Sequence, residues 1–434
     1  MTVSASTSLK SEPRAEASRA AAVQKVMSKS GIEVWLVEDY AVPLVALEFA
    51  FRGGASQDPA GKPGVASLLA GLLDEGAGSY DSNAFHQVLD DYALEISFSA
   101  DRDILSGRMQ TLARHTDKAF ELLRLCVNEA RLDDEPFERV KSQIAAGLKR
   151  EINDPDYAAS RAFRHFAYPS HPYGVPVRGD LSTLANLTQA DLNAMRAATF
   201  SRGGLKIAAV GAIDAATLAK HIDDVFGALP ETASLAAIPD TAVAGIGALH
   251  VIDLDIPQST IRFGRQGLAR KDPDFVPATV VNHVLGGGVF SARLFREVRE
   301  KRGLAYSAYS QLVTYDHGAM LTGSTSTKNE RAAEAMDVVR DEIRSLAEQG
   351  PSEEELDKAK KYLIGSYALR FDTSTKIAGQ LVHLQTDGYD VDYLDERNKL
   401  FAAVSMEDAQ RASSRLLDKG ELLVVVAGRP DGMK

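Results

Sequence analysis

The sequence has very little cysteine. Cys126 is the only one among 434 residues, and a single thiol can form neither an internal disulfide nor a thiolate metal cluster. Cys126 lies in the run AFELLRLCVNEARL, whose apolar spacing is typical of a helix. We therefore predict that it fills a hydrophobic core.

The sequence also lacks long apolar runs and an excess of basic residues. No stretch approaches the roughly 20 apolar residues of a membrane span, and the first residues have no apolar centre of the signal-peptide type. Lys and Arg number 49 against 60 Asp and Glu, a net charge of -11, which repels polyanions. We expect a soluble protein that binds neither membrane nor nucleic acid, cytoplasmic as written, or periplasmic if a leader peptide was removed.

Two parts of the chain repeat one plan, and its length is sufficient for two cores. The repeated features are a loop with Asp-Pro, a helix start, a capping box and a glycine that ends a strand. They fall 214 to 219 residues apart, at Asp58 and Asp272, Asp133 and Ser352, Thr188 and Ser405, and Gly211 and Gly428. Four features in register indicate an internal repeat.

The repeat predicts an α+β fold with two homologous domains, residues 22–235 and 247–434, joined by a linker at 236–246. Residues 1–21 are rich in Ser, Ala and charge and are predicted to be flexible. Regular βαβ spacing is absent, so each domain should be a mixed or antiparallel sheet with helices on one face. Near the start we expect a hairpin around Gly31, then a strand with Leu47, Phe49 and Phe51 on one face, then the helical run GVASLLAGLLDEG.

The stretch 286–310, GGGVFSARLFREVREKRGLAYSAYS, predicts a loop, a short helix and a strand. Ser291 is a candidate helix N-cap, and Gly303 is placed to end the helix before the strand begins near Leu304. On the polar face, Glu297 is spaced to pair with Arg293 and Lys301, and Glu300 with Arg296. Arg299 is left without such a partner.

The run RLFREVREKRGLAYS closely resembles the second-half motif of the pitrilysin/insulinase family of zinc peptidases, the inverzincins. FRGGASQDPAGKPGVASLLAGLL in the first half adds weaker similarity, and together the resemblance covers nearly the whole chain after about residue 25. It implies that Arg299 and Tyr306 bind the peptide backbone at the scissile bond, and that Gly286, Gly287 and Gly288 let backbone approach the peptide closely. It also implies two domains that together form half of a clamshell.

The first half departs from the family where zinc would bind. Active members carry His-x-x-Glu-His, whose two imidazoles bind the metal and whose glutamate is the general base. Those positions fall on Ser67, Ala70 and Gly71, and the third ligand on Ala146 or Gly147. None of these side chains can do that work, so the metal entry for this chain is none.

The remaining histidines and acids have ordinary interpretations. No two of the nine histidines lie three or four residues apart, which disfavours a replacement metal site. We interpret His283 as a hydrogen-bonded structural histidine and His171 as part of a loop. The acids Asp90, Asp91 and Glu95 are interpreted as surface charge.

Together these features predict a non-catalytic, substrate-binding subunit of a heterodimeric zinc metallopeptidase of the bacterial type. The chain would bind unfolded peptide and supply Arg299 and Tyr306, while a zinc-bearing homologous subunit supplies the metal and the general base. Two alternatives stay open: a structural core subunit like the peptidase-derived proteins of respiratory complexes, and a stand-alone peptide-binding protein. The sequence does not distinguish general peptide degradation from maturation of one precursor.

Overall fold

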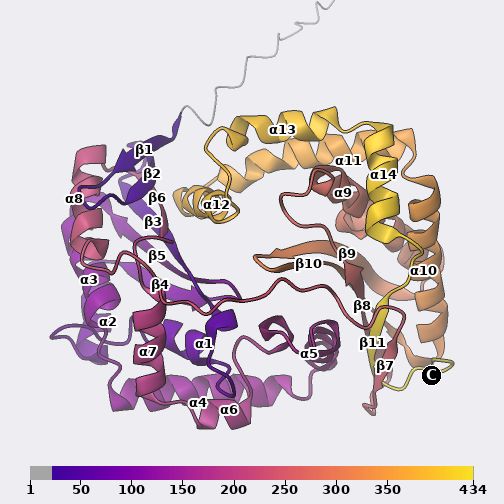
Figure 1. The fold of residues 1–434 in the computed structure, drawn as a ribbon, viewed down its shortest axis with the longest axis horizontal. Helices are drawn as coiled ribbons and strands as arrows, with labels where there is room; N and C mark the ends of the chain where they lie inside the picture. The colour runs from indigo at the N-terminus through magenta and orange to yellow at the C-terminus, as the bar shows by residue number, and fades with distance from the viewer. Residues whose placement is uncertain (1–21, 434) are drawn as a thin grey trace, which may run out of the picture.

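The computed structural model describes residues 22–433, so the predicted flexible segment 1–21 lies outside the described residues. Two β-sheets stand at opposite ends of the molecule, each with helices on its outer side (Figure 1). This arrangement confirms the predicted α+β class with one sheet in each half of the chain.

The first sheet has the strand order β1-β2-β6-β3-β5-β4, with β2 and β6 parallel and the other neighbours antiparallel. In β3 the side chains of Leu47, Phe49 and Phe51 are buried on one face, as predicted. The strands are β1 Gln24–Met27, β2 Glu33–Glu38, β3 Leu44–Arg52, β4 Glu95–Ala100, β5 Ile104–Leu112 and β6 Lys206–Gly211.

The helices of the first half cover the outer face of this sheet and bury a large apolar core that includes Cys126. The run GVASLLAGLLDEG is a regular helix only over Val65–Ala70, because Gly71 begins a series of tight turns. The helices are α1 Val65–Ala70, α2 Ser82–Asp91, α3 Thr116–Glu129, α4 Asp134–Glu151, α5 Pro155–Ala167, α6 Leu181–Ala185, α7 Gln189–Thr199 and α8 Ala215–Phe226, with 3₁₀ turns η2 Ala55–Gln57, η3 Ala113–His115 and η4 Pro172–Gly174.

The second sheet has the order β7-β11-β8-β10-β9, again with one parallel pair, β7 and β11. Its strands are β7 Leu249–Ile252, β8 Gln258–Gln266, β9 Ala305–Tyr315, β10 Gly318–Lys328 and β11 Leu423–Ala427. The helices are α9 Phe275–Asn282, α10 Ala332–Gln349, α11 Glu353–Gly365, α12 Ser374–Thr386, α13 Tyr393–Ala403 and α14 Met406–Leu417, with π-helical segments η5 His283–Gly287 and η7 Phe295–Glu300 and 3₁₀ turns η6 Val289–Ser291, η8 Asn329–Arg331 and η9 Ser366–Phe371.

The two sheets match strand for strand, and the first has β1 in addition. Thr188 and Ser405 each form a capping box at the start of a helix, as predicted. Gly211 and Gly428 end equivalent strands with φ of 137° and 142°, a conformation that favours glycine. No helix or strand lies between Phe226 and Leu249, while the exact linker 236–246 stays a prediction.

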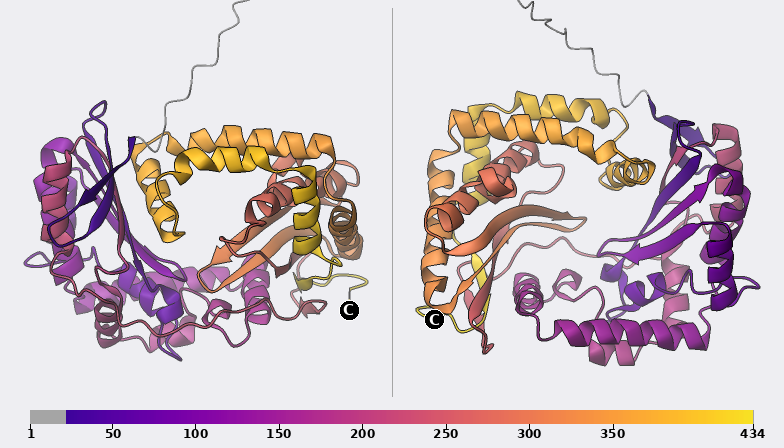
Figure 2. Two further views of the ribbon diagram at one scale, coloured as in Figure 1. Left: turned by 45° about the horizontal axis from the view of Figure 1, so that its top comes forward. Right: turned by 180° about the vertical axis from the view of Figure 1, so that it is seen from behind.

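Each sheet also contacts a helix from the other half. Helix α12 packs Leu381 against Trp35 and Val210 on the inner face of the first sheet, and Gln385 donates to the carbonyl of Ile207 at 2.9 Å. Helix α5 packs in the equivalent way against the second sheet, through the apolar residues Phe163, Ala167, Met320, Leu423 and Val425. The two halves are therefore joined through their sheets, and Figure 2 shows α12 reaching from the second-half helices towards the first sheet.

The tip of the β9–β10 hairpin makes a polar contact with the first half. The Asp103 carboxylate accepts from the Tyr173 hydroxyl at 2.8 Å and from the Asp316 backbone N–H at 3.0 Å, and Arg52 forms an ion pair with Asp316. His171 bonds to the carbonyl of Pro239 at 2.9 Å. His171 therefore holds the connecting segment, in keeping with a loop role.

Candidate functional site

The three positions that would carry His-x-x-Glu-His lie on α1. Ala70 is buried, and Ser67 and Gly71 are half-buried. A Cβ at Gly71 would come within 3.2 Å of Val140 Cγ1 on α4, so α1 packs closely against that helix. A side chain the size of histidine would have to displace Val140.

The position of the third ligand faces a cation. A Cβ at Gly147 on α4 would have the Nη1 of Arg178 as its neighbour, at 3.8 Å, and Arg178 pairs with Glu151 at 2.5 Å. A guanidinium at this place disfavours a divalent metal. Within residues 22–433 no cluster of three or more His, Cys, Asp or Glu side chains is placed to hold a metal ion. The residues present do not fit zinc.

The three glycines of the second half have different surroundings. Gly286 is buried, and a Cβ on it would lie 2.4 Å from the Ser310 backbone nitrogen, so its lack of a side chain lets the turn pack on β9. Gly288 is half-buried, and Gly287 is exposed. A close approach of an external peptide, as predicted for all three, is sterically open at Gly287.

The turn after η7 brings Arg299 and Tyr306 together. Gly303 adopts φ of 57° and ends the helical segment, as predicted, and the Leu304 N–H donates to the Val298 carbonyl at 2.8 Å. The chain then enters β9, and the Arg299 guanidinium carbon lies 4.4 Å from the centroid of the Tyr306 ring. The same guanidinium lies 4.8 Å from the ring centroid of Phe295. The two residues form a cation–π pair.

Both members of this pair have polar groups left over. The Tyr306 side chain is 80% exposed, and its hydroxyl has no partner among the described residues. No carboxylate of residues 22–433 lies within ion-pair distance of Arg299, in agreement with the sequence prediction. A guanidinium and a phenol are both hydrogen-bond donors, so the pair presents donors to solvent side by side.

The neighbouring charges pair only partly as the spacing predicted. Lys301 contacts Glu297 at 2.7 Å, as expected, but Arg302 also does so at 2.8 Å, five residues away. The π-helical turn is wider than an α-helical turn, which brings residues five apart together. Burial alone would raise the pKa of Glu297, but hydrogen bonds from Lys301 and Arg302 lower that pKa to about 2.

Two other predicted pairs were wrong. Arg293 contacts Glu355 on α11 at 2.6 Å instead of Glu297, and Arg296 lies near Glu297 and Glu355 instead of Glu300. Ser291 does not cap a helix, because its hydroxyl donates to the Gly288 carbonyl at 3.0 Å within a 3₁₀ turn. These contacts tie η7 to α11, a segment some 60 residues away in the sequence.

The other residues considered from sequence have structural or surface positions. His283 is buried, its ring stacks on Tyr362 with centroids 4.9 Å apart, and burial lowers its pKa, so it is neutral at neutral pH. Asp90, Asp91 and Glu95 are exposed, as predicted for surface charge.

Sequence reasoning missed a polar cluster beside the pair, on the inner face of the second sheet. Arg262 of β8 donates to the Tyr309 hydroxyl at 3.1 Å and to Asp156 of α5 at 3.2 Å. The only sequence signal was an arginine inside the apolar strand STIRFGRQ.

Comparison with known proteins places this architecture in one family. The model of the insulinase family, peptidase family M16, matches residues 34–178, and the model of the peptidase M16 inactive domain matches residues 186–363. The chain belongs to the M16 peptidase family. It is 26% identical over 349 residues to the non-peptidase homolog YmxG of Helicobacter pylori, covering 80% of each chain.

Solved structures of M16 proteins agree with the fold. A peptidase M16 inactive domain from Pseudomonas fluorescens superposes with a TM-score of 0.88 at 27% identity, covering 95% of this chain and 99% of that one. A protease from Helicobacter pylori shares the fold, with a TM-score of 0.83, 19% identity and coverage of 93% and 99%. With α1 unable to bind zinc, this chain is an inactive-type member of the M16 family. None of the described helices is long and apolar enough to cross a bilayer.

Proposed function

We propose that this chain is the substrate-binding, non-catalytic subunit of a heterodimeric zinc metallopeptidase. A zinc-bearing M16 homologue is the partner and supplies the metal and the general base, and this chain supplies Arg299 and Tyr306 to the same site. The observation that carries the proposal is the exposed Arg299–Tyr306 pair on a chain whose own α1 has no zinc ligands.

The chemistry of the pair suits peptide hydrolysis. Attack on a peptide carbonyl places negative charge on its oxygen, and donors fixed near that oxygen stabilise the transition state. Stacking on Arg299 restricts the Tyr306 ring, and the exposed hydroxyl is free to donate to that oxygen. Arg299, which has no carboxylate partner, can donate to a neighbouring carbonyl of the bound peptide.

The inner face of the first sheet supports binding of a polar main chain. A cavity of about 430 Å³ there is lined by Glu48, Ser97, Ser99, Ser106 and Arg108. Hydroxyl groups donate and accept, so they can pair with the amides of an unfolded peptide. Burial raises the pKa of Glu48 to about 7, although Arg108 acts in the opposite direction. Glu48 is thus partly protonated at neutral pH and can donate as well as accept.

Reconstitution tests the proposal. The chain and a zinc-bearing M16 homologue from the same genome are purified apart and mixed, and sedimentation and cleavage of a fluorogenic peptide are measured. We expect a 1:1 complex at micromolar concentration that cleaves the peptide, and no cleavage by this chain alone. Assembly without any dependence of turnover on Arg299 and Tyr306 would support a structural core subunit instead. Peptide binding without a partner would support the stand-alone binding protein.

A further inference from the structure

Strand β9 has an edge that no other strand covers. It is the last strand in the order β7-β11-β8-β10-β9 and is 11 residues long. Its pairing with β10 is regular from Ala308 to Tyr315, with one irregularity nearer Tyr306. Natural sheets usually shorten or distort such edges, because an unpaired row of N–H and C=O groups accepts another chain. A long regular edge therefore needs an explanation.

A groove runs beside this edge. A cavity of about 440 Å³ is lined by four consecutive residues of β9, from Tyr309 to Leu312. Side chains of a strand alternate between the two faces of the sheet, and within the described residues the sheet contributes no strand other than β9 to the lining. A cavity over one face would also touch β10. The groove therefore lies along the edge of the strand.

The opposite wall of the groove is built from α9 and the glycine turn. Thr279 and Asn282 of α9 line it, together with Gly286 and Gly287. Gly287 is exposed and has no side chain, so a bound chain can come close to the turn there. Asn282 is held by Ser310, whose hydroxyl donates to the Asn282 side-chain carbonyl at 2.8 Å. The width of the groove is thus set by a rigid contact between its two walls.

We propose that an extended segment of the peptide substrate binds in this groove as an added strand beside β9. This rests on the proposed function and names how the substrate is held. Tyr306 and Leu312 are six residues apart, which is about 20 Å along a strand. A peptide of about seven residues then spans the groove and the Arg299–Tyr306 pair. Recognition is through main-chain hydrogen bonds, so the substrate class is unfolded segments of varied sequence that lack proline at the pairing positions.

The walls select a single chain over a second copy of the protein. Edge-to-edge pairing of two sheets needs open space beside the strand, whereas α9 and the glycine turn stand beside this edge. The equivalent edge strand of the first half, β4, differs. The cavity there is lined by residues of β3, β4 and β5 and so lies across the face of the sheet.

The test uses the reconstituted complex with a partner whose general-base glutamate is replaced by glutamine, so that peptide binds without being cleaved. The probe is a fluorescein-labelled peptide of ten residues that the active complex cleaves, together with ten variants that each carry one N-methylated amide. An N-methyl group removes a donor and blocks strand pairing. We expect at least tenfold weaker binding at alternate positions over part of the peptide, with little effect at the positions between them.

Gln311→Trp assigns that pattern to β9. Gln311 is exposed and lines the groove, so indole should fill the groove without unfolding the sheet. We expect about tenfold weaker binding of the parent peptide, and the N-methyl penalties at the β9-pairing positions should disappear. Gln311→Ala, which leaves the groove open, and Ser99→Trp on β4 are the controls and should bind as the unmodified chain does. Thermal melting checks that each variant is folded.

Each other outcome overturns a defined statement. Equal binding by the unmodified chain and Gln311→Trp, or no alternation in the N-methyl series, overturns the groove inference while the proposed function stands. A complex that neither binds nor cleaves peptide overturns the proposed function and the groove inference with it. Self-association of the chain that Gln311→Trp abolishes would assign the edge to a second copy and overturn the peptide.

Discussion

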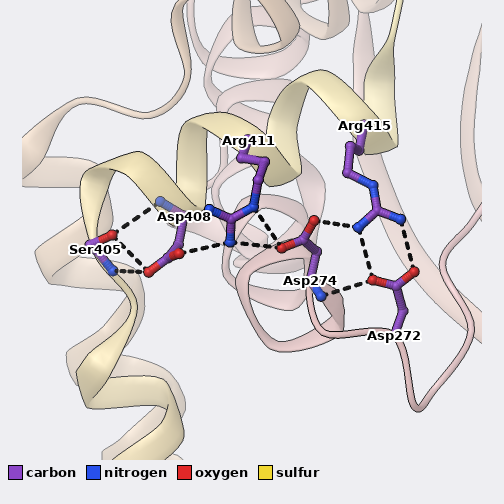
Figure 3. A network of polar contacts seen from close by, with 6 residues as sticks. All are labelled: Asp272, Asp274, Ser405, Asp408, Arg411 and Arg415. Atoms are coloured by element: carbon purple, nitrogen blue, oxygen red, sulfur yellow. Dashed lines mark hydrogen bonds and ion pairs between the residues drawn. The ribbon is translucent and has the colours of Figure 1, made fainter.

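The two halves of the chain share a strand order but hold the loop after their long central strand in different ways. In the first half, the Asp58 carboxylate accepts the backbone N–H groups of Gly64 and Ala66, at 2.7 and 2.8 Å, just before α1. In the second half, Asp272 and Asp274 bind two arginines of α14, Arg411 and Arg415 (Figure 3). The first loop is closed by local contacts and the second by contacts across some 140 residues.

This difference coincides with the position of the candidate site. The local loop precedes α1, where the zinc positions carry Ser67, Ala70 and Gly71. The long-range network precedes α9, which leads through the glycine turn to Arg299 and Tyr306. The half that presents the exposed donors is thus the half whose framework is anchored by ion pairs. The same fold supports a closed helix in one half and an exposed pair in the other.

The largest effect should come from Tyr306→Phe in the reconstituted complex. The ring and its stacking on Arg299 are kept, while one donor to the reacting carbonyl is lost, so kcat and kcat/KM should both fall by about a hundredfold or more. Tyr40→Phe, an exposed tyrosine of the first half, is the matched control and should leave turnover unchanged. Unaltered turnover from an assembled Tyr306→Phe complex would place the function elsewhere.

Asp274→Asn should destabilise the second half. The Asp274 side chain is buried and accepts from Arg411 at 2.8 Å and also from Arg415. Loss of charged hydrogen bonds to a buried acceptor should reduce the free energy of unfolding by about 2 kcal/mol at pH 7, measured by urea unfolding. Asp408→Asn, at the exposed end of the same network, should cost less. Equal stability of Asp274→Asn and the unmodified chain would show that the network does not anchor the loop.

The cost of Asp274→Asn should depend on pH. Burial would raise the pKa of Asp274, but hydrogen bonds from Arg411 and Arg415 outweigh it and lower the pKa below 3.8. The stabilisation is therefore complete above the unfolded pKa and is lost as the pH falls through the folded value. The difference between variant and unmodified chain should shrink below about pH 4.

Asp58→Asn provides the contrast from the first half. Burial raises the pKa of Asp58 to about 7, although the two backbone donors act in the opposite direction. For a raised carboxyl pKa the folded state binds more protons than the unfolded state between the two values, so stability falls as pH rises through this range. Asp58→Asn cannot ionise and should lose this dependence, so its free energy of unfolding should fall less than that of the unmodified chain between pH 4 and 7. Parallel pH curves would contradict this assignment.

Arg299→Ala should weaken peptide binding about tenfold, a smaller effect than that of Tyr306→Phe on turnover. The contact is made to the bound peptide before reaction, so KM should rise, and the loss of stacking should loosen Tyr306 and lower kcat modestly. Arg296→Ala on the same segment is the control, since Arg296 contacts Glu297 and Glu355. A change in kcat alone, with KM unaltered, would mean that Arg299 does not hold the ground state.

The smallest effect should be that of zinc on this chain alone. Without a tight site, added zinc should change the melting temperature by less than about 1 °C, whereas the partner should be stabilised by its metal. Metal analysis should find no stoichiometric zinc in the purified chain. One tight zinc per chain would contradict the degenerate site and reopen the assignment of the catalytic half.

Several features were predictable from sequence because they depend on neighbouring residues. The capping boxes at Thr188 and Ser405 and the end of the η7 segment at Gly303 are set by backbone geometry within a few residues. The motif RLFREVREKRGLAYS placed Arg299 and Tyr306 in the candidate site before any coordinates. Loss of the zinc ligands was equally plain, because Ser, Ala and Gly have no ligating group at neutral pH.

Other features arise only when distant segments meet. The ion pair of Arg293 is with Glu355 because η7 packs beside α11, and helical spacing within η7 could not reveal that neighbour. The crossing of α5 and α12 and the groove beside β9 likewise depend on how two sheets and their helices pack. Local composition determined the repeat, the capped helices and the absent zinc ligands. Tertiary packing decided which charges meet, which glycine is exposed and which strand edge stays open, because burial and long-range contact have no local signature in the chain.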